Sequence, residues 1–554
     1  MKAPSFYLAA CALSCLTLLV LLTSSWNSSP CYDEPEHVTA GYTQVQRGEF
    51  WMNPYHPPLA KELSGMALSL VAWNDPWDHW GQRYKEACID DLFYRQGNDP
   101  QLLIRIARAP LILTSALFVL FFTLALRPQI GPSAALLAGL MLALCPTFLA
   151  HGPLVTTDAP ATALMFVATA LFYAWARYPD RRHTLALGLW TGMAWLVKFS
   201  ALILPVFYLL YLGLQRAGRK HWRSLGQALL LAGALVGLVY AATPVPQDHQ
   251  SWYNQRTLKN RQHPLVRLIR ASEAIPGLRH YSWYLTGLVS QSRHLTRGHD
   301  QPAYVKRTFY QGGRWDFFPT LLASKEPVPW ILLVGTALMM TPLWLRRAGP
   351  EVRGYLLFSM LFLGVALIAR LNLGIRHLLP MYPSLFALTA WFWASYLPGV
   401  GWKTFSLYTV SLASVGTATS LALAHPGYLA YFNEAVGGKE LGAEIALDSN
   451  FDWGIDLYRL ALYVEEENIP TIYLYYYGRN HPRAYLKDCY ILFPRVPLQP
   501  GELLAISAGL YLRCELAVEG KIAPPDDMDL ETLRWILSRP RKLRIGDTLW
   551  ILET

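Results

Sequence analysis

The segment TLALGLWTGMAWLVKFSALILPVFYLLYLGLQ (184–215) decides the fold, because it fits either one long helix or two short helices hinged near Lys198 and Ser200. A membrane span needs about 20 apolar residues, and fewer where the bilayer is thin or the chain re-enters. Loop charge separates the two interpretations, because Lys and Arg gather on cytoplasmic loops. Two helices keep the basic clusters at Arg216 and Arg346 on the cytoplasmic side, whereas one helix places both outside. The two-helix interpretation is therefore preferred.

The whole chain has the composition of an integral membrane protein. Of its 554 residues, 53% are hydrophobic and 16% are charged, and 20 Trp and 31 Tyr suit a protein with two membrane–water interfaces. The net charge of +10 does not indicate nucleic-acid binding, because Lys and Arg lie mostly between apolar runs. The first apolar run is interpreted as a retained span, because no clear small-x-small cleavage site precedes Pro30.

The pattern predicts a multi-pass α-helical membrane protein of about eleven spans, with a cytoplasmic N-terminus. The predicted spans are 6–25, 105–126, 132–150, 160–176, 184–198, 200–215, 226–243, 327–345, 354–371, 377–398 and 403–424. Residues 1–424 then form the membrane domain, and loops 26–104 and 244–326 lie on the extracytoplasmic side. The tail 425–554 lies there too, and its helix-like start followed by short strands predicts a small α/β domain.

Three finer predictions concern the outer segments. An oxidising compartment permits disulfides, and Cys31–Cys88 and Cys489–Cys514 are the natural pairs by segment, although spacing alone does not fix connectivity. The stretch RTLKNRQHPLVRLIR (256–270) has the composition of an interfacial helix or of a solvated loop helix. Acids recur every four residues in the tail and predict an acidic stripe on one helix, at Glu444, Asp448, Asp452 and Asp456.

Three acids stand next to predicted spans on the same side of the membrane. Asp33 and Glu34 follow the first span directly, and Asp158 begins another. Acids in this position are ordinarily solvated loop residues. An ionisable group at the edge of a span is nevertheless expensive to bury unpaired, which makes it a functional hypothesis. Two such acids at one face frame a pocket in which one acts as general base toward a hydroxyl and the other orients it.

Cations are predicted on the same face. Arg108 begins the second span, Lys198 occupies the hinge of the hairpin, and Arg376 and His377 stand between two spans. Each alone is commonly an anchor whose charged end reaches the membrane surface. Together with the acids they indicate a site for an anionic group, where a phosphate is held and stabilised as a leaving group.

The order of the motifs resembles that of polyprenyl-phosphate-dependent glycosyltransferases with the GT-C fold, which include the family-39 protein mannosyltransferases and the bacterial aminoarabinose transferase of lipid A. The motifs that carry the resemblance are YDEPEH (32–37), NPYHPPLAKEL (53–63), ARAPLIL (107–113), TTDAP (156–160) and RHLLPMYP (376–383). The resemblance covers roughly residues 1 to 400. The tail is similar to that of a bacterial branch with an extra outer domain.

The resemblance implies roles for single residues. Asp33 is implied as the base that deprotonates the acceptor, with Glu34 beside it and Asp158 in support. Arg108, Arg376 and Lys198 are implied to hold the donor phosphate, with His377 next to them. The chain departs from the pattern before the two prolines, where Tyr55 and His56 replace an acid and a lysine. His56 takes over the contact of that lysine only when protonated, and an unperturbed histidine is mostly neutral at pH 7.

The implied activity is transfer of a sugar from a polyprenyl-phosphate donor to a hydroxyl of a protein, lipid or glycan acceptor, with inversion, at the outer face of a bacterial inner membrane. No residue pattern demands a cofactor, and a divalent metal ion is left open. Two alternatives are a lipid or sugar transporter and a non-catalytic assembly protein. A transporter predicts internal repeats with charges near the midplane, and we see no repeat of the first half in the second.

Overall fold

The structure is a computed structural model, and it describes residues 3–74, 77–80, 84–241, 302–493 and 501–553. Between 266 and 298 it also describes all residues except 268, 270, 272–274, 276, 277 and 279. The interfacial helix predicted at 256–270 falls largely outside these residues, as does the first part of the loop 244–326.

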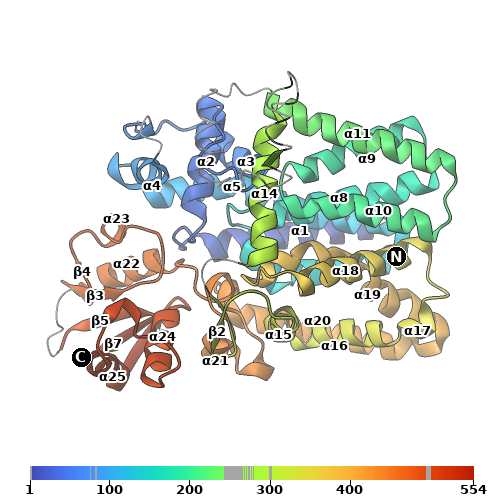
Figure 1. Cartoon of the computed structure of the whole chain (residues 1–554). Helices are drawn as coiled ribbons and strands as arrows, with labels where there is room; N and C mark the ends of the chain where they lie inside the picture. The colour runs from blue at the N-terminus through green and yellow to red at the C-terminus, as the bar shows by residue number, and fades with distance from the viewer. Residues whose placement is uncertain are drawn as a thin grey trace.

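Long apolar helices lie side by side and form the body of the molecule (Figure 1). Six helical stretches are long and apolar enough to cross a membrane, and three shorter apolar helices accompany them in the described part of the chain. The helices of this bundle are α1 (Ala3–Ser25), α5 (Pro100–Ile130), α6 (Pro132–Ala143), α7 (Pro146–His151), α8 (Asp158–Arg177), α9 (Arg181–Trp195), α10 (Ile203–Leu214), α11 (Arg219–Ala241), α16 (Val328–Met339), α17 (Thr341–Trp344), α18 (Pro350–Ile368), α19 (Tyr382–Trp391) and α20 (Lys403–Ala424). Every predicted span overlaps one of them, and the prediction of a multi-pass α-helical membrane protein is confirmed.

The decisive segment 184–215 forms two helices, as loop charge predicted. α9 ends at Trp195, and a 3-10 turn over Phe199–Leu202 leads into α10. Between them Lys198 has an extended backbone, with φ −153° and ψ 137°, so the helix cannot continue through it. The hinge therefore lies where the sequence indicated.

The basic residues at the helix ends gather at one end of the bundle. Arg127, at the end of α5, donates to the hydroxyl of Tyr7 near the start of α1 at 2.6 Å. Arg177, at the end of α8, pairs with Glu351 at the start of α18 at 2.5 Å. Figure 1 shows the N-terminus at this end and the C-terminal sheet at the other. Arg127 and Arg177 thus lie at the same end of the bundle as the N-terminus, which is called the basic end below.

The other end carries the helices α2 (Glu34–Arg47), α3 (Leu59–Leu68), α4 (Lys85–Asp90), α14 (Tyr281–Arg297) and α15 (Phe317–Lys325). Two glycines let α2 and α3 cross with their backbones in contact. A Cβ on Gly41 would lie 2.0 Å from the carbonyl oxygen of Lys61, and one on Gly65 would lie 2.1 Å from the carbonyl oxygen of Gly41. No side chain fits at either position, so the crossing fixes the segment that follows Asp33.

The tail folds around a five-stranded mixed sheet of order β4-β3-β5-β7-β6. β3 is parallel to β4 and β5, and β7 is antiparallel to β5 and β6. Its elements are α21 (Gly438–Ile445), α22 (Leu457–Glu466), β3 (Ile472–Tyr475), α23 (Arg483–Leu486), β4 (Tyr490–Leu492), β5 (Leu503–Ser507), α24 (Ala508–Val518), α25 (Leu530–Ser538), β6 (Arg541–Ile545) and β7 (Leu549–Glu553). The predicted small α/β unit is therefore present.

The disulfide prediction is wrong, since all seven cysteines are free. Cys489 packs in the cluster that α22 forms on one side of the sheet, whereas Cys514 is buried in the cluster of α24 and α25. Cys31 packs against Leu154 and Trp453, and Cys88 belongs to a different apolar cluster. Each predicted pair is thus divided between two separate cores.

The predicted acidic stripe is also wrong, because the four acids do not share a helix. α21 ends at Ile445 and α22 begins at Leu457, with an irregular segment between them. Asp448 in this segment has a φ of 57°, which interrupts any helix. Asp452 and Asp456 are buried rather than solvated.

The glycine contact between α2 and α3 generates a prediction. Gly41→Val is expected to destabilise the fold by more than the about 1–3 kcal/mol that overpacking usually costs, because its methyl groups meet backbone atoms that have no room to move. The unfolding temperature should fall accordingly. Gly335→Val in α16 is the matched control, since a Cβ added there would meet no atom of the described residues within 4 Å. Equal unfolding temperatures for the two variants, measured by a thermal shift assay in detergent, contradict the packing described.

Candidate active site

Arg376 brings two of the predicted acids together. Its guanidinium nitrogens Nη1 and Nη2 each lie 3.3 Å from Oδ2 of Asp33, and Nη1 lies 3.5 Å from Oδ2 of Asp158. Asp33 comes from the start of α2, Asp158 from the start of α8, and Arg376 from the 3-10 helix Ile375–Met381. Three segments far apart in sequence therefore meet at one point, as the sequence predicted from their sidedness.

Asp158 is the more enclosed of the two carboxylates. Its side chain is 3% exposed, against 36% for Asp33. Besides Arg376, Asp158 pairs with the ammonium group of Lys198 from the hinge between α9 and α10. A buried carboxylate between two cations stays ionised and is held in one orientation. Asp33 keeps access to solvent, and so to an incoming molecule.

Glu34 and Arg108 form a separate, fully buried ion pair. The guanidinium of Arg108 donates to both carboxylate oxygens of Glu34, at 2.8 and 2.6 Å. Its other N–H groups donate to the carbonyl oxygens of Ser25, Ser28 and Ser29 and to the Ser28 hydroxyl. Every donor of Arg108 is engaged by the protein, so the geometry does not support the predicted contact of Arg108 with a phosphate.

Glu34 has both carboxylate oxygens engaged as well. It also accepts hydrogen bonds from the backbone N–H of Cys31 at 2.7 Å and of Val155 at 2.9 Å. Val155 lies three residues before Asp158, and Cys31 lies two residues before Asp33. Glu34 therefore ties together the two segments that carry the acids, and the structure gives it a positioning contact in place of a catalytic one.

Histidines surround the two acids, and sequence reasoning singled out only two of them. His377 and His151 lie close enough to Asp158 to interact with its charge. His37 and His56, from the α2–α3 segment, stack at 5.2 Å between ring centres. His37 lies four residues after Asp33, on the same face of α2, and His151 is the last residue of α7. Helical spacing from Asp33 was the available signal for His37.

Several buried polar atoms at this place have no hydrogen-bond partner within the described part of the chain. They are Nε of Arg376, Nε2 of His377, Nδ1 of His151 and Nδ1 of His37. Buried polar groups are nearly always satisfied, and a cluster of exceptions calls for an explanation. A polar ligand or water accounts for them, which makes this cluster the candidate active site.

Burial keeps the outer histidines neutral. It lowers the pKa of His37 to about 4, with the nearby Lys61 charge adding to the effect, and it lowers the pKa of His56 well below its usual value. His56 therefore offers an N–H group without a positive charge, so burial works against the protonation that His56 would need to take over the contact of a lysine. The ammonium of Lys61 is itself buried and donates to the carbonyl oxygens of Asn53 and His56.

The tail contributes one wall of the site, which the sequence did not reveal. Asn450 accepts from the backbone N–H of Ile375 at 2.9 Å and donates to the carbonyl oxygen of Leu373 at 3.0 Å. Further along, Trp453 accepts at its carbonyl oxygen from the N–H of Tyr32 at 2.9 Å. The segment 449–455 thus runs between the residues that precede Asp33 and those that precede Arg376.

Trp453 presents its ring to the central guanidinium. Cζ of Arg376 lies 4.2 Å above the centre of the indole, and the ring of His151 meets it edge-on at 6.0 Å. The side chain is 1% exposed. A cation over an indole face is attracted by the ring quadrupole, more strongly where water is excluded. Trp453 therefore helps to fix the orientation of Arg376.

The described residues provide no donor set for a divalent metal ion. No group of three or more His, Cys, Asp or Glu side chains among them is arranged to hold a metal. Asp33 and Asp158 face cations instead of each other. A metal ion at this place would have to displace Arg376 or Lys198.

With this geometry in view, comparison with known proteins is informative. Residues 101–245 match the model of a family described as dolichyl-phosphate-mannose-protein mannosyltransferase. The match supports the family resemblance predicted from the sequence, and two of its motifs, ARAPLIL (107–113) and TTDAP (156–160), lie within the matched stretch. This stretch contains Arg108, Asp158 and Lys198, whereas Asp33 and Arg376 lie outside it. Comparison with curated proteins gives no match.

Two solved membrane enzymes are similar in structure. ArnT from Cupriavidus metallidurans, bound to undecaprenyl phosphate, is 14% identical, with a TM-score of 0.47 over 100% of this chain and 99% of that one. The archaeal oligosaccharyltransferase AglB from Archaeoglobus fulgidus, in complex with an inhibitory peptide and a dolichol-phosphate, is 12% identical. Its TM-score is 0.48, over 98% of this chain and 74% of that one.

The buried pair generates a prediction about stability. Glu34→Gln leaves the Arg108 charge buried without a counter-charge, and breaking such a pair costs about 3–5 kcal/mol. The unfolding temperature is expected to fall strongly, while the exposed control Glu466→Gln unfolds like the wild type. The double variant Glu34→Gln/Arg108→Met is expected to lose less than the sum of the single changes, because no lone charge remains. Additive losses refute the pairing.

Proposed function

We propose that the protein is a membrane glycosyltransferase that moves a sugar from a polyprenyl-phosphate donor to an acceptor hydroxyl. The observation that carries the proposal is the contact of Arg376 with both Asp33 and Asp158, beside buried polar atoms that lack partners among the described residues. The family match over residues 101–245 supports a lipid-phosphate sugar donor. The gathering of charged groups at one end of the bundle favours an enzyme over a transporter, whose charges are expected near the midplane.

The proposed reaction is a single displacement. The acceptor oxygen attacks the anomeric carbon, the bond from that carbon to the phosphate oxygen breaks, and the polyprenyl phosphate leaves with the bonding electrons. Asp33 takes the acceptor proton, because it is the more exposed carboxylate. Attack from the side opposite the leaving group inverts the configuration. A lipid phosphate is a good leaving group, so positioning and charge stabilisation supply most of the catalysis.

Other residues receive supporting roles. Nε of Arg376 and Nε2 of His377 are the buried nitrogens that a phosphate group would satisfy, and Lys198 adds a charge nearby. Asp158 keeps Lys198 and Arg376 in place and ionised. Glu34 and Arg108 hold the segments together without touching the substrate.

The location follows from loop charge. The basic end of the bundle is proposed to be cytoplasmic, which puts the site, residues 26–104 and the domain 425–554 on the extracytoplasmic side of a bacterial inner membrane. The membrane domain then comprises residues 1–424. Impermeant thiol labelling of cysteines introduced at exposed positions Glu466 and Arg346 tests this, because only the former is expected to react from outside.

The base assignment gives a direct test. Asp33→Asn is expected to reduce transfer from a polyprenyl-phosphate sugar by about 100-fold or more, the range of a lost general base. Donor binding and the unfolding temperature should remain near the wild-type values. Asp488→Asn is the matched control, since its side chain is 88% exposed in the tail. Full transfer by Asp33→Asn, measured with purified protein, would refute the assignment.

The wall formed by the tail gives a second test. Trp453→Leu removes the ring over Arg376 and is expected to lower kcat/KM about 2- to 30-fold, the range of a cation–π contact. Trp453→Phe keeps an aromatic face and should restore part of the rate. Trp535→Leu is the control, because that indole also lies beneath a guanidinium, 4.9 Å from Cζ of Arg539, but in the sheet unit.

A double variant separates the positioning role of Trp453 from a merely structural role. In an Arg376→Gln background, which places no cation over the ring, Trp453→Leu is expected to cause little further loss of kcat/KM, because the contact is already gone. Independent, additive losses in the double variant argue against the positioning role.

A further inference from the structure

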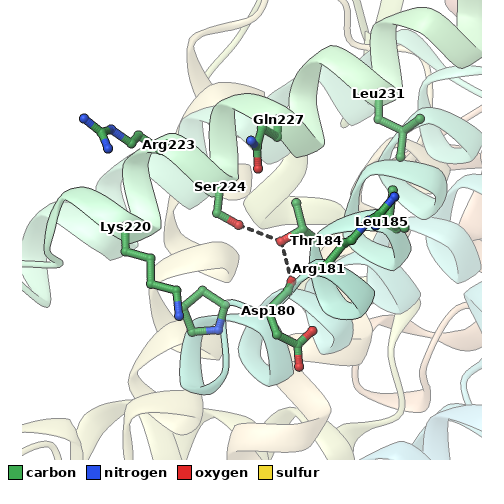
Figure 2. A pocket seen from close by; sticks show the side chains of 10 residues that line it. Asp180, Arg181, Thr184, Leu185, Lys220, Arg223, Ser224, Gln227 and Leu231 are labelled. Carbon is green, nitrogen blue, oxygen red and sulfur yellow. Dashed lines mark hydrogen bonds between the residues drawn. The ribbon is translucent and has the colours of Figure 1, made fainter.

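A cavity lined by polar and apolar side chains lies between α9 and α11, and Figure 2 shows the residues that line it. α8 carries Asp158 at its first residue and Arg177 at its last, and a helix of 20 residues is about 30 Å long. The cavity lies beside the turn that follows α8, so it opens on the other face of the membrane. Its volume is about 630 Å³, which is in the range of small-molecule sites.

The floor of the cavity is a closed network of hydroxyl groups. The hydroxyl oxygens of Thr184 and Ser224 lie 2.6 Å apart, and the indole N–H of Trp175 donates to both, at 3.2 and 3.0 Å. Thr184 also donates to the carbonyl oxygen of Asp180 at 2.6 Å. Figure 2 shows the contacts that Thr184 makes with Ser224 and with Asp180. The floor therefore joins the two helices rigidly.

The rim of the cavity is positively charged. Arg181, Lys220 and Arg223 line it, are exposed, and form no ion pair with any residue that the structure describes. Asp180 is the carboxylate of the lining, and it is engaged by the backbone N–H of His183 at 2.9 Å and by the ring of that histidine at 3.0 Å. Three cations and one occupied carboxylate are among the lining residues, so the net charge around the cavity favours an anion.

Two helix N-termini add to this charge. Thr184 meets Ser224, and a Cβ on Gly188 would lie 2.7 Å from the carbonyl oxygen of Ala228. The contacts advance along both helices in the same direction, so α9 and α11 are parallel and both begin at the cavity. Each N-terminus carries a partial positive charge and backbone N–H groups that the helix itself does not satisfy.

Below the rim the lining turns apolar. Leu185 and Leu231 form part of the wall, and Leu185 is 50% exposed. Leu189 and Leu230 are 45% and 75% exposed on the same two helices, as expected for side chains in contact with acyl chains. A ligand that fits has an anionic head and an apolar tail. We propose that this cavity binds the phosphate head group of an anionic phospholipid, with an acyl chain along α9 and α11.

Titration of the purified full-length protein in detergent with dioleoylphosphatidylglycerol and with dioleoylphosphatidylcholine, followed by native mass spectrometry, tests the proposal. The anionic lipid is expected to bind more tightly. Each basic residue near an anionic lipid contributes about fivefold in affinity. The variant Arg181→Gln/Lys220→Gln/Arg223→Gln should therefore lose roughly 100-fold.

The matched control neutralises three exposed cations at the same end of the bundle but outside the cavity, Arg346, Arg347 and Lys403, each to Gln. It should bind phosphatidylglycerol like the wild type. Inorganic phosphate in place of lipid is expected to compete weakly, because it lacks the apolar contact. Equal binding of the two lipids, equal loss in both triple variants, or competition by phosphate as strong as by lipid overturns the proposal.

Discussion

The buried ion pair between Glu34 and Arg108 is the constraint on which the rest of the site depends. A carboxylate and a guanidinium with almost no exposure are stable together only if each remaining polar atom also finds a partner. Glu34 meets this requirement by accepting from the N–H groups of Cys31 and Val155. The same hydrogen bonds set the separation between Asp33 and Asp158. Satisfying one pair of charges therefore determines where two other acids lie.

Charge balance then distinguishes the two acids of the site. Asp33 and Asp158 neutralise Lys198 and Arg376 in the structure as it stands. Asp158 is enclosed and shares both cations, whereas Asp33 pairs, among the residues that the structure describes, with Arg376 alone, at 3.3 Å and from a partly exposed position. A phosphate that approaches Arg376 would weaken its contact with Asp33 first. In the proposed reaction, the carboxylate freed by this exchange is the one that accepts the proton.

The sequence revealed the bundle and much of the site because both follow from the cost of burying charge. Apolar runs marked the helices, and loop charge placed Lys198 at a hinge and Asp33 on the same side as Asp158. These patterns could not predict which single side chains are buried or which partners they bind. Arg108 looked like a phosphate ligand because nothing in a linear sequence shows that its donors are already satisfied. The spacing of the acids up to Asp456 likewise suggested one helix, whereas the positive φ of Asp448 interrupts it.

The tail was the largest part of the site that the sequence did not predict, because its contribution depends on contacts between residues more than 70 positions apart. Asn450 bonds to the backbone before Arg376, and Trp453 covers the guanidinium itself. Both contacts originate in an irregular segment without helical or strand periodicity, so no pattern marked it as functional. An irregular backbone must still satisfy its N–H and C=O groups, and here it does so against Tyr32 and Leu373. Satisfying that backbone is what brings the indole onto Arg376, so the C-terminal segment and the helical bundle build one site together.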